Sequence, residues 1–600
     1  MSGALERVRA AYARIARADR PEVWIDLRPQ EDAEAEAAAI DARTAAGERL
    51  PLAGTVLAVK GNIDVAGLPT TAGCPSYAYR PEADAPAVAR LRAAGSVVLG
   101  STNLDQFATG LVGTRSPYGA VRNAVDPAYV SGGSSSGSAV AVALGLVDLA
   151  LGTDTAGSGR VPAAFNGVVG LKPTHGLVPT EGVVPACASL DCVTVFARTL
   201  PEAERALSFM AAPVEPAAAP PRRPGPWRIA VPDAPQLGEM DGGWAEAFEA
   251  AAARLADAGA ELLSVDLEPF TEAAAMLYDG AFVAERYSAV GAFVDEHAGD
   301  PGLDPTVAGI VSGARDVPAH RLYADRERLA ALRARALASL GEADALLLPT
   351  TPGHPTVSKV AADPLGANAR LGRFTNSTNL FGLAAAAVPA GEVAGRPFGV
   401  MLVGPAHTDE RLARIAGLLT APPLHLAVVG AHLSGQPLNG QLLALGGRFV
   451  RTTATAPAYQ LYVLDTTPPK PGLVRVREGG AAIEAEVWRL RAEGLGALVA
   501  ALPRPMALGS VELADGTSVP GFLCEPEALD GAREITAHGG WRAALAAQLL
   551  GVRGHDHPTD CRADRSARAT DTLRDRNPGS CAGEHSVGSP VDRTGDPTDR

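Results

Sequence analysis

Lysine is rare in this chain, and its scarcity singles out candidates for acid–base chemistry. Of 53 basic residues only four are lysines, at positions 60, 172, 359 and 470, and the others are arginines. Arginine carries surface charge equally well but does not lose its proton near neutral pH, whereas a buried lysine can. Lys60 follows an apolar run, residues 56–59, that would bury its amine. Lys60 is therefore the first candidate for a lysine that exchanges its proton near neutral pH.

Two segments rich in glycine and serine offer a nucleophile for such a base. Residues 133–137 satisfy the G-x-S-x-G pattern of α/β-hydrolases, which would make Ser135 the nucleophile. That pattern normally follows a hydrophobic strand, whereas residues 126–129 here read Asp-Pro-Ala-Tyr. A turn that opens a helix over 138–146 is therefore the better interpretation. The second segment holds Ser158 among small residues.

Four motifs in this part of the chain resemble the amidase signature family of serine hydrolases: AVKGNIDVAG, GGSSSGS, GTDTAGSGR and GLKPTHG. Their combination is specific, and the resemblance extends over about residues 1–420. It implies an α/β fold in which a mixed β-sheet is wrapped by helices. It also implies a Ser–cis-Ser–Lys triad with Ser158 as nucleophile, Ser134 as the bridging cis-serine and Lys60 as base. Neither a metal ion nor an organic cofactor is required.

The residues themselves are compatible with this chemistry. Neutral Lys60 would take the proton of the Ser158 hydroxyl through Ser134 and later help to protonate the leaving amine. Small residues beside the nucleophile let a substrate approach the main chain, so their backbone N–H groups could hold the oxyanion. The predicted oxyanion donors are Thr155, Ala156 and Gly157.

The nucleophile loop departs from the common amidase pattern at Ala156, where the family usually has glycine. With residues 185–197 and 277–287, this loop resembles the allophanate hydrolase branch of the family. The resemblance implies that Tyr278 and Arg286 hold the substrate carboxylate. Eight residues are a little over two helical turns, so we expect both side chains near one face of a helix. Without the resemblance, the pair reads as an ordinary half-buried helical stripe.

Residues 425–550 are rich in strand-like runs and resemble the second domain of allophanate hydrolases. The resemblance implies a γ-glutamylcyclotransferase-like α+β barrel that decarboxylates the first product, N-carboxycarbamate. The candidates for that site are His432, Glu486 and His538. A structural interpretation competes for each, since the histidines would cap loops and Glu486 would face solvent from a strand. A role of this domain in assembly alone also stays open.

The helices and strands that position these residues are predicted from the periodicity of apolar residues. Apolar residues at a helical spacing predict helix across the first fifty residues, and short apolar runs that alternate with helical stretches predict a mixed α/β sheet. We expect strands over 228–231, 345–348 and 398–403, and helices over 86–94, 244–258 and 410–419. A change in composition near 420–424 indicates a domain boundary. Residues 554–600 have few large apolar side chains, so we expect a disordered tail.

Charge, hydropathy and cysteine content argue against several classes of protein. A net charge of −14 argues against nucleic acid or an anionic membrane as a partner. No apolar stretch reaches the roughly 18 residues of a membrane span, and the first residues lack the apolar core of a signal peptide, so we expect a cytoplasmic protein. Six cysteines without paired spacing argue against a metal site.

The expected activity is hydrolysis of allophanate, a small molecule also called urea-1-carboxylate, to ammonia and carbon dioxide. Two alternatives stay open: an amidase for another small amide such as malonamate, and the glutaminase subunit of a tRNA amidotransferase. Because members of the family commonly form dimers, we expect a homodimer. An assembly that degrades urea is a further expected partner.

Overall fold

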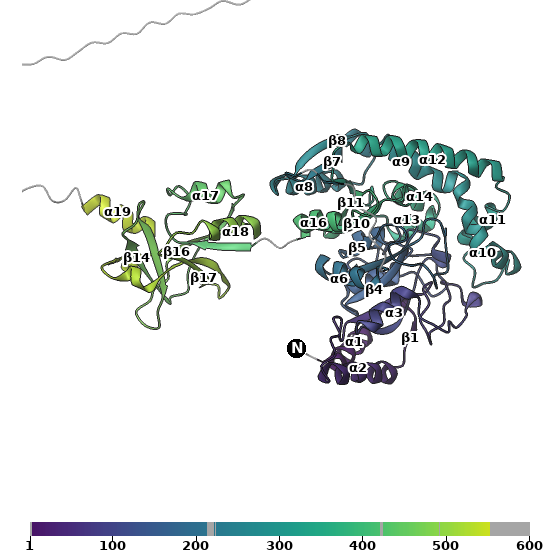
Figure 1. The fold of residues 1–600 in the computed structure, drawn as a ribbon, viewed down its shortest axis with the longest axis horizontal. Helices are drawn as coiled ribbons and strands as arrows, with labels where there is room; N and C mark the ends of the chain where they lie inside the picture. The colour runs from purple at the N-terminus through teal and green to yellow at the C-terminus, as the bar shows by residue number, and fades with distance from the viewer. Residues whose placement is uncertain (1–2, 213–220, 223, 421–423, 491, 552–600) are drawn as a thin grey trace, which may run out of the picture.

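The structure is a computed structural model that describes residues 3–212, 221–222, 224–420, 424–490 and 492–551. Figure 1 shows one body of secondary structure that ends with helix α16 (Asp409–Thr420) and another that begins with strand β12 (Leu424–Val428). The buried apolar side chains of the two bodies form separate clusters. The tail expected over 554–600 lies outside the described residues.

A mixed sheet organises the first body. In the described ranges its strands follow the order β1-β3-β2-β4-β6-β5-β10-β11-β9-β7-β8. Several of these strands are buried at every residue, as expected of a sheet covered on both faces. The bounds are β1 Trp24–Leu27, β2 Val56–Lys60, β3 Val97–Thr102, β4 Leu149–Asp154, β5 Val169–Lys172, β6 Cys192–Ala197, β7 Arg228–Pro232, β8 Glu261–Val265, β9 Ala345–Pro349, β10 Ala384–Val393 and β11 Arg396–Gly404.

Helices cover this sheet, and the fold matches the mixed sheet wrapped by helices that the resemblance implied. Helices α5 and α16 both contact β10 and β11, and α9 lies beside α12 (Figure 1). The remaining bounds are α1 Ala4–Ala18, α2 Gln30–Ala45, α3 Pro86–Ala93, α4 Ser136–Ala143, α5 Arg160–Asn166, α6 Leu200–Met210, α7 Ala234–Leu237, α8 Trp244–Asp257, α9 Glu268–Asp279, α10 Ala284–Glu296, α11 Pro305–Gly313, α12 Ala319–Leu340, α13 Val357–Ala362, α14 Gly366–Leu371 and α15 Asn376–Leu380.

The register of the sheet gathers polar residues at one edge. Strand β2 pairs in parallel with both β3 and β4. The carboxyl ends of these three strands, at Lys60, Thr102 and Asp154, therefore lie at the same edge. Loops that follow the carboxyl ends of parallel strands commonly carry ligand sites. The segments that hold Ser134 and Ser158 both adjoin this edge.

The prediction that the first fifty residues are helical is wrong in its middle. Strand β1 separates α1 from α2 and pairs antiparallel with β3. Pro21 and Pro29 flank this strand, and proline cannot continue a helix from the preceding turn. The sequence Trp-Ile-Asp-Leu between them suits a short strand at a sheet edge.

The second body contains two open sheets among its described residues, with strand orders β13-β16-β12-β18-β17 and β15-β14-β19. The strands do not close into the barrel that the resemblance implied, because β13 and β17 remain edges of the larger sheet. The bounds are β13 Arg448–Ala454, β14 Tyr459–Leu464, β15 Lys470–Arg475, β16 Glu484–Leu490, β17 Met506–Glu512, β18 Ser518–Cys524, β19 Arg533–Glu534, α17 Asn439–Ala444, α18 Ala492–Ala500 and α19 Trp541–Gly551. Across the described ranges, no helix is both long and apolar enough to span a membrane.

Candidate active site

Lys60 lies at the end of β2, in the fully buried interior of the sheet. Its Nζ is 2.7 Å from Ser134 Oγ and 2.7 Å from Thr153 Oγ1. Burial lowers the pKa of Lys60 to about 7, against the opposing charges of three carboxylates, Asp105, Asp191 and Asp154. A large fraction of this amine is therefore neutral near pH 7 and able to accept a proton.

Ser134 lies in the turn before α4 and accepts a hydrogen bond from Lys60. The peptide bond between Gly133 and Ser134 is cis, the geometry that the resemblance implied for this serine. Gly133 is tightly enclosed, since a Cβ at this position would lie 2.0 Å from Asp105 Oδ2. The backbone N–H of Asp105 donates to the Ser134 carbonyl at 3.1 Å, so this buried aspartate holds the turn in place.

Ser158 lies in the loop between β4 and α5, and only 2% of the residue is exposed. The backbone N–H of Ser135 donates to the Ser158 carbonyl at 3.4 Å, which brings the two serine-bearing loops together. Within the described part of the chain, Lys60 and Ser134 are hydrogen-bonded, whereas the hydroxyls of Ser134 and Ser158 are not. Such catalytic contacts often form fully only when substrate is bound.

Asp154 fixes the backbone around Ser158. Its carboxylate accepts the N–H of Gly157 at 2.8 Å and of Gly159 at 3.0 Å, and it forms an ion pair with the buried Arg160 at 2.9 Å. Burial alone would raise the pKa of Asp154, but the Arg160 guanidinium and these N–H donors lower it to about 2. The carboxylate is therefore charged and rigidly held.

These contacts distinguish the predicted oxyanion donors by whether their backbone N–H is already hydrogen-bonded. The N–H of Gly157 is already bonded to Asp154, so this residue does not offer a free donor. Thr155 and Ala156 make no backbone N–H hydrogen bond to any described residue. The Thr155 hydroxyl donates to Asp191 at 2.5 Å, which holds the residue that joins these two N–H groups. The loop geometry therefore favours Thr155 and Ala156.

Asp191 and Thr153 are two residues that motif reasoning missed. Asp191 lies just before β6, where its carboxylate also accepts the N–H groups of Ala186 and Cys187. Burial raises the pKa of Asp191, and its hydrogen bonds and the nearby Arg286 oppose that shift. A polar aspartate inside the apolar segment 185–197 was the only signal in the sequence for this role.

The expectation that Tyr278 and Arg286 share one helix is wrong, although their side chains do meet. Helix α9 ends before Gly280, and a short 3₁₀ turn separates it from α10, which carries Arg286. Arg286 Nη2 nevertheless lies 3.2 Å from the Tyr278 hydroxyl. Its guanidinium carbon lies 5.4 Å from the centre of the Tyr278 ring. The pair is formed across a break in the helix.

Arg286 is a buried cation for which the described ranges supply no ion-pair partner. Its Nη1 donates to Thr109 Oγ1 at 2.8 Å, and no carboxylate in the described ranges lies within 4 Å of the guanidinium. Burial acts to lower the pKa of Arg286, but the nearby Tyr278, Cys187 and Asp191 raise it overall. A buried charge without a counter-ion is unfavourable, so this arrangement is suited to receiving an anion.

Comparisons with known proteins agree with this geometry. A family model described as Amidase matches residues 6–413. The chain belongs to the amidase family of amidohydrolases. A second model, described as the allophanate hydrolase C-terminal domain, matches residues 424–546. The amidase region thus contains the whole cluster around Lys60, and the second match contains all three candidates of the second body.

Two relatives of this amidase match more than four fifths of the chain, and a third matches a shorter part. The chain is 42% identical over 546 residues to urea amidolyase of Saccharomyces cerevisiae. The match covers 83% of this chain but only 30% of that relative, which is therefore much longer. The chain is 39% identical to a solved allophanate hydrolase of Kluyveromyces lactis, covering 91% of this chain and 97% of that one with a TM-score of 0.65. A glutamyl-tRNA(Gln) amidotransferase component of Thermus thermophilus is 37% identical over 403 residues, which cover 61% of this chain and 84% of the relative.

Of the three candidates in the second body of this amidase, one lines its large cavity. His432 lines a cavity, whereas His538 is exposed in a short 3₁₀ turn. Glu486 does not face solvent from its strand. It is 2% exposed, and its carboxylate accepts hydrogen bonds from Ser434 and Trp488 and pairs with Arg542 at 2.7 Å. Burial would raise the pKa of Glu486, but Arg542 and the other donors lower it.

Proposed function

We propose that this chain hydrolyses allophanate, with Ser158 as nucleophile, Ser134 as proton relay and Lys60 as base. The observation that carries the proposal is Arg286, a buried cation without a protein counter-ion in the described ranges, whose charge is felt by Asp191 beside the nucleophile loop. Allophanate has one carboxylate that Arg286 can bind and one carboxamide that can be cleaved. The resemblance to the Kluyveromyces lactis allophanate hydrolase supports this choice over other small amides.

The proposed reaction begins with attack of Ser158 Oγ on the carboxamide carbon, while Lys60 takes the proton through Ser134. The N–H groups of Thr155 and Ala156 stabilise the oxyanion. The proton then passes to the leaving nitrogen, so that the C–N bond breaks and ammonia departs. Water attacks the acyl-enzyme by the same route in reverse and releases N-carboxycarbamate.

The second body is proposed to decarboxylate that product. The C–N bond to one carboxylate breaks, its electron pair stays on nitrogen, and the nitrogen takes a proton as CO₂ leaves. His432 is the proposed donor. Burial is the main cause that lowers the pKa of His432, so the resting imidazole is neutral. An anion bound beside it would raise that pKa and draw a proton onto the ring.

Two further parts of the proposal concern organisation. Residues 1–420 and 425–550 are proposed to fold as separate domains, which their separate hydrophobic clusters support. A homodimer is proposed, and so is membership of an assembly that degrades urea. Mass measurement in solution tests the homodimer directly.

A substrate panel tests the activity. Ammonia release would be compared for allophanate, malonamate, biuret, urea and glutamine at equal concentrations. We expect the highest kcat/KM for allophanate, because it alone combines the ureido amide with a carboxylate at the right distance. If glutamine were hydrolysed faster than allophanate, the proposal would be wrong and a glutaminase role would replace it.

A further inference from the structure

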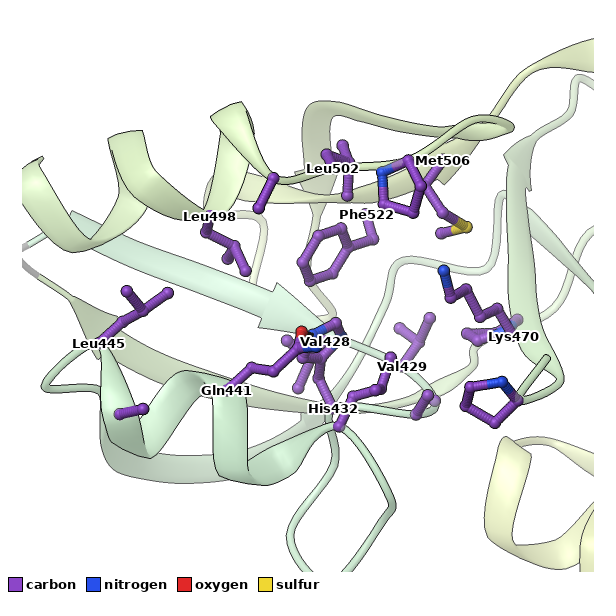
Figure 2. A pocket seen from close by; sticks show the side chains of 18 of the residues that line it. Val428, Val429, His432, Gln441, Leu445, Lys470, Leu498, Leu502, Met506 and Phe522 are labelled. Atoms are coloured by element: carbon purple, nitrogen blue, oxygen red, sulfur yellow. Dashed lines mark hydrogen bonds between the residues drawn. The ribbon is translucent and has the colours of Figure 1, made fainter. Parts of the chain in front are cut away.

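The second body contains a cavity of about 520 Å³ that the first reaction does not use. Figure 2 shows it between the loop after β12, helix α18 and the start of β15. Most of its walls are apolar, with Leu498, Met506 and Phe522 among them. A cavity of this kind with a few polar groups is the usual form of a small-molecule site.

Three polar side chains, of His432, Gln441 and Lys470, project into this cavity (Figure 2). His432 is held on two sides. Its ring stacks on Phe522 with centroids 4.7 Å apart and planes 12° apart, and its Nε2 lies 3.2 Å from Gln441 Oε1. The imidazole therefore has a fixed orientation before any ligand arrives.

Lys470 is one of four lysines in a chain that otherwise uses arginine for positive charge. Its amine points into the cavity toward Met506 (Figure 2). Within the described ranges, no carboxylate lies within 4 Å of it, and the side chain makes no hydrogen bond. The nearby buried acid, Glu486, is already neutralised by Arg542. Lys470 is close enough to His432 for its charge to lower the pKa of that imidazole.

We propose that Lys470 is the carboxylate-binding residue of this cavity and that the cavity takes a small dicarboxylate. One carboxylate pairs with Lys470, which leaves the atom between the two carboxylates beside His432. The inference rests on the decarboxylation proposed above and names the group that positions its substrate.

The apolar walls give this placement a chemical consequence. Desolvating a carboxylate is unfavourable, whereas CO₂ is neutral and loses little on leaving water. With one carboxylate held by Lys470, the other faces Leu498 and Phe522 without a described cation beside it. Loss of CO₂ from that end removes the poorly solvated charge, the electron pair of the broken bond stays on nitrogen, and His432 supplies the proton.

The first test measures binding without turnover. Malonate is the probe, because it replaces the central NH of N-carboxycarbamate by CH₂ and cannot release CO₂ under mild conditions. It would be titrated by calorimetry into the full chain carrying Arg286→Ala, which removes the proposed carboxylate site of the amidase region. Lys470→Ala in this background should weaken malonate binding about ten- to a hundred-fold, and Lys470→Arg should keep most of it. Lys359→Ala, a substitution of an exposed lysine on α13, is the matched control and should change nothing.

A second measurement separates this inference from the decarboxylation it rests on. Turnover of ¹³C-labelled allophanate by the full chain would be followed by NMR. Lys470→Ala should raise the concentration of carboxylated intermediate relative to the unsubstituted chain. If Lys470→Ala binds malonate as tightly as its parent, the Lys470 assignment is wrong. If malonate binding depends on Lys470 but His432→Ala consumes the intermediate at the normal rate, the carboxylate site stands and the proposed decarboxylation fails.

Discussion

The two candidate sites of this molecule place lysine in opposite surroundings. Lys60 is fully buried and bonded to two hydroxyls, with three buried carboxylates acting on it from further away. Lys470 is half-buried, faces an apolar cavity and has no described carboxylate within 4 Å. Burial can therefore make one lysine a proton acceptor, whereas partial exposure leaves the other suited to act as a charge.

The same contrast applies to the acids. In the first body Asp154 and Asp191 are buried and accept several backbone N–H groups, so they hold the nucleophile loop rigidly. In the second body the buried Glu486 is tied to Arg542 and does not line the cavity. A rigid polar network suits a site that must align three catalytic groups. A mostly apolar cavity with one cation suits a step in which a substrate loses charge.

The largest expected effect comes from exchanging these lysines for arginine. Lys60→Arg should lower kcat for ammonia release by about 10²–10⁴-fold, because arginine keeps the charge but cannot accept the proton of Ser158. Lys470→Arg should leave this step unchanged and retain most malonate binding. Release of the first ammonia by each full-length variant, with Lys359→Arg as control, measures the effect on kcat, and calorimetry measures malonate binding. Retention of more than about a tenth of activity by Lys60→Arg would contradict the role of Lys60 as base.

Sequence reasoning predicts the groups that the proposed chemistry needs, but it does not reveal the residues that hold them. Lys60, Ser134 and Ser158 stand in short motifs whose residue types already indicate a function, and the pairing of β2 with β4 brings their segments to one sheet edge. The contact between Arg286 and Thr109 joins residues 177 positions apart, and no local pattern encodes it. Asp191 was missed for the same reason, because the contact of its carboxylate with the Thr155 hydroxyl, 36 positions away, forms only after folding.

Single residues also interrupted helices that the local apolar pattern predicted. A helical stripe through residues 277–287 was a reasonable interpretation, yet helix α9 ends before Gly280 and a 3₁₀ turn follows it. Glycine lowers helix stability, so this break had a visible cause in the sequence. Likewise, Pro21 and Pro29 indicated that the first fifty residues would not be one helical region. The strands of the second body were recognisable, but their failure to close a barrel depends on long-range pairing.

The next largest effect concerns the buried cation. Arg286→Ala should lower kcat/KM for allophanate about ten- to a hundred-fold, because a charge-assisted contact to the substrate carboxylate is lost. For an uncharged amide of similar size, such as biuret, the loss should be much smaller. Tyr278→Phe, which removes one hydroxyl beside the guanidinium, should give a milder loss in the same direction. Equal losses on both substrates would mean that Arg286 only stabilises the fold.

The pH dependence of the first reaction tests whether burial makes Lys60 a base. With a pKa of about 7, the neutral amine increases as pH rises through 7, so kcat/KM for allophanate should rise and then level off. The charge of Asp191 raises that pKa, so Asp191→Asn should move the rising limb toward lower pH. Asp515→Asn, at an exposed acid of the second body, is the control. An upward shift with Asp191→Asn would contradict this electrostatic account.

The smallest expected effect concerns the difference between two histidines that each stack on a phenylalanine. His354 stacks on Phe165 in the first body, with centroids 3.8 Å apart, and burial is the main cause that lowers its pKa to about 4. Its Nε2 contacts the Val130 carbonyl at 2.8 Å, so this ring has a structural partner. His432 stacks on Phe522 in the same manner but faces a cavity.

If the stack on Phe522 orients His432 for proton transfer, Phe522→Leu should slow consumption of the carboxylated intermediate. An aromatic contact contributes roughly 0.5–1.5 kcal/mol, which corresponds to about two- to ten-fold in rate. Release of the first ammonia from allophanate should stay the same, because Phe522 lies in the other body, whereas the second ammonia follows decarboxylation and should be slowed with it. Phe449→Leu, at a half-exposed phenylalanine of β13, controls for a general loss of stability. If both variants slowed the step equally and lost equally in melting temperature, the stack on Phe522 would be a packing contact. His432 would then resemble His354 in having a structural stack.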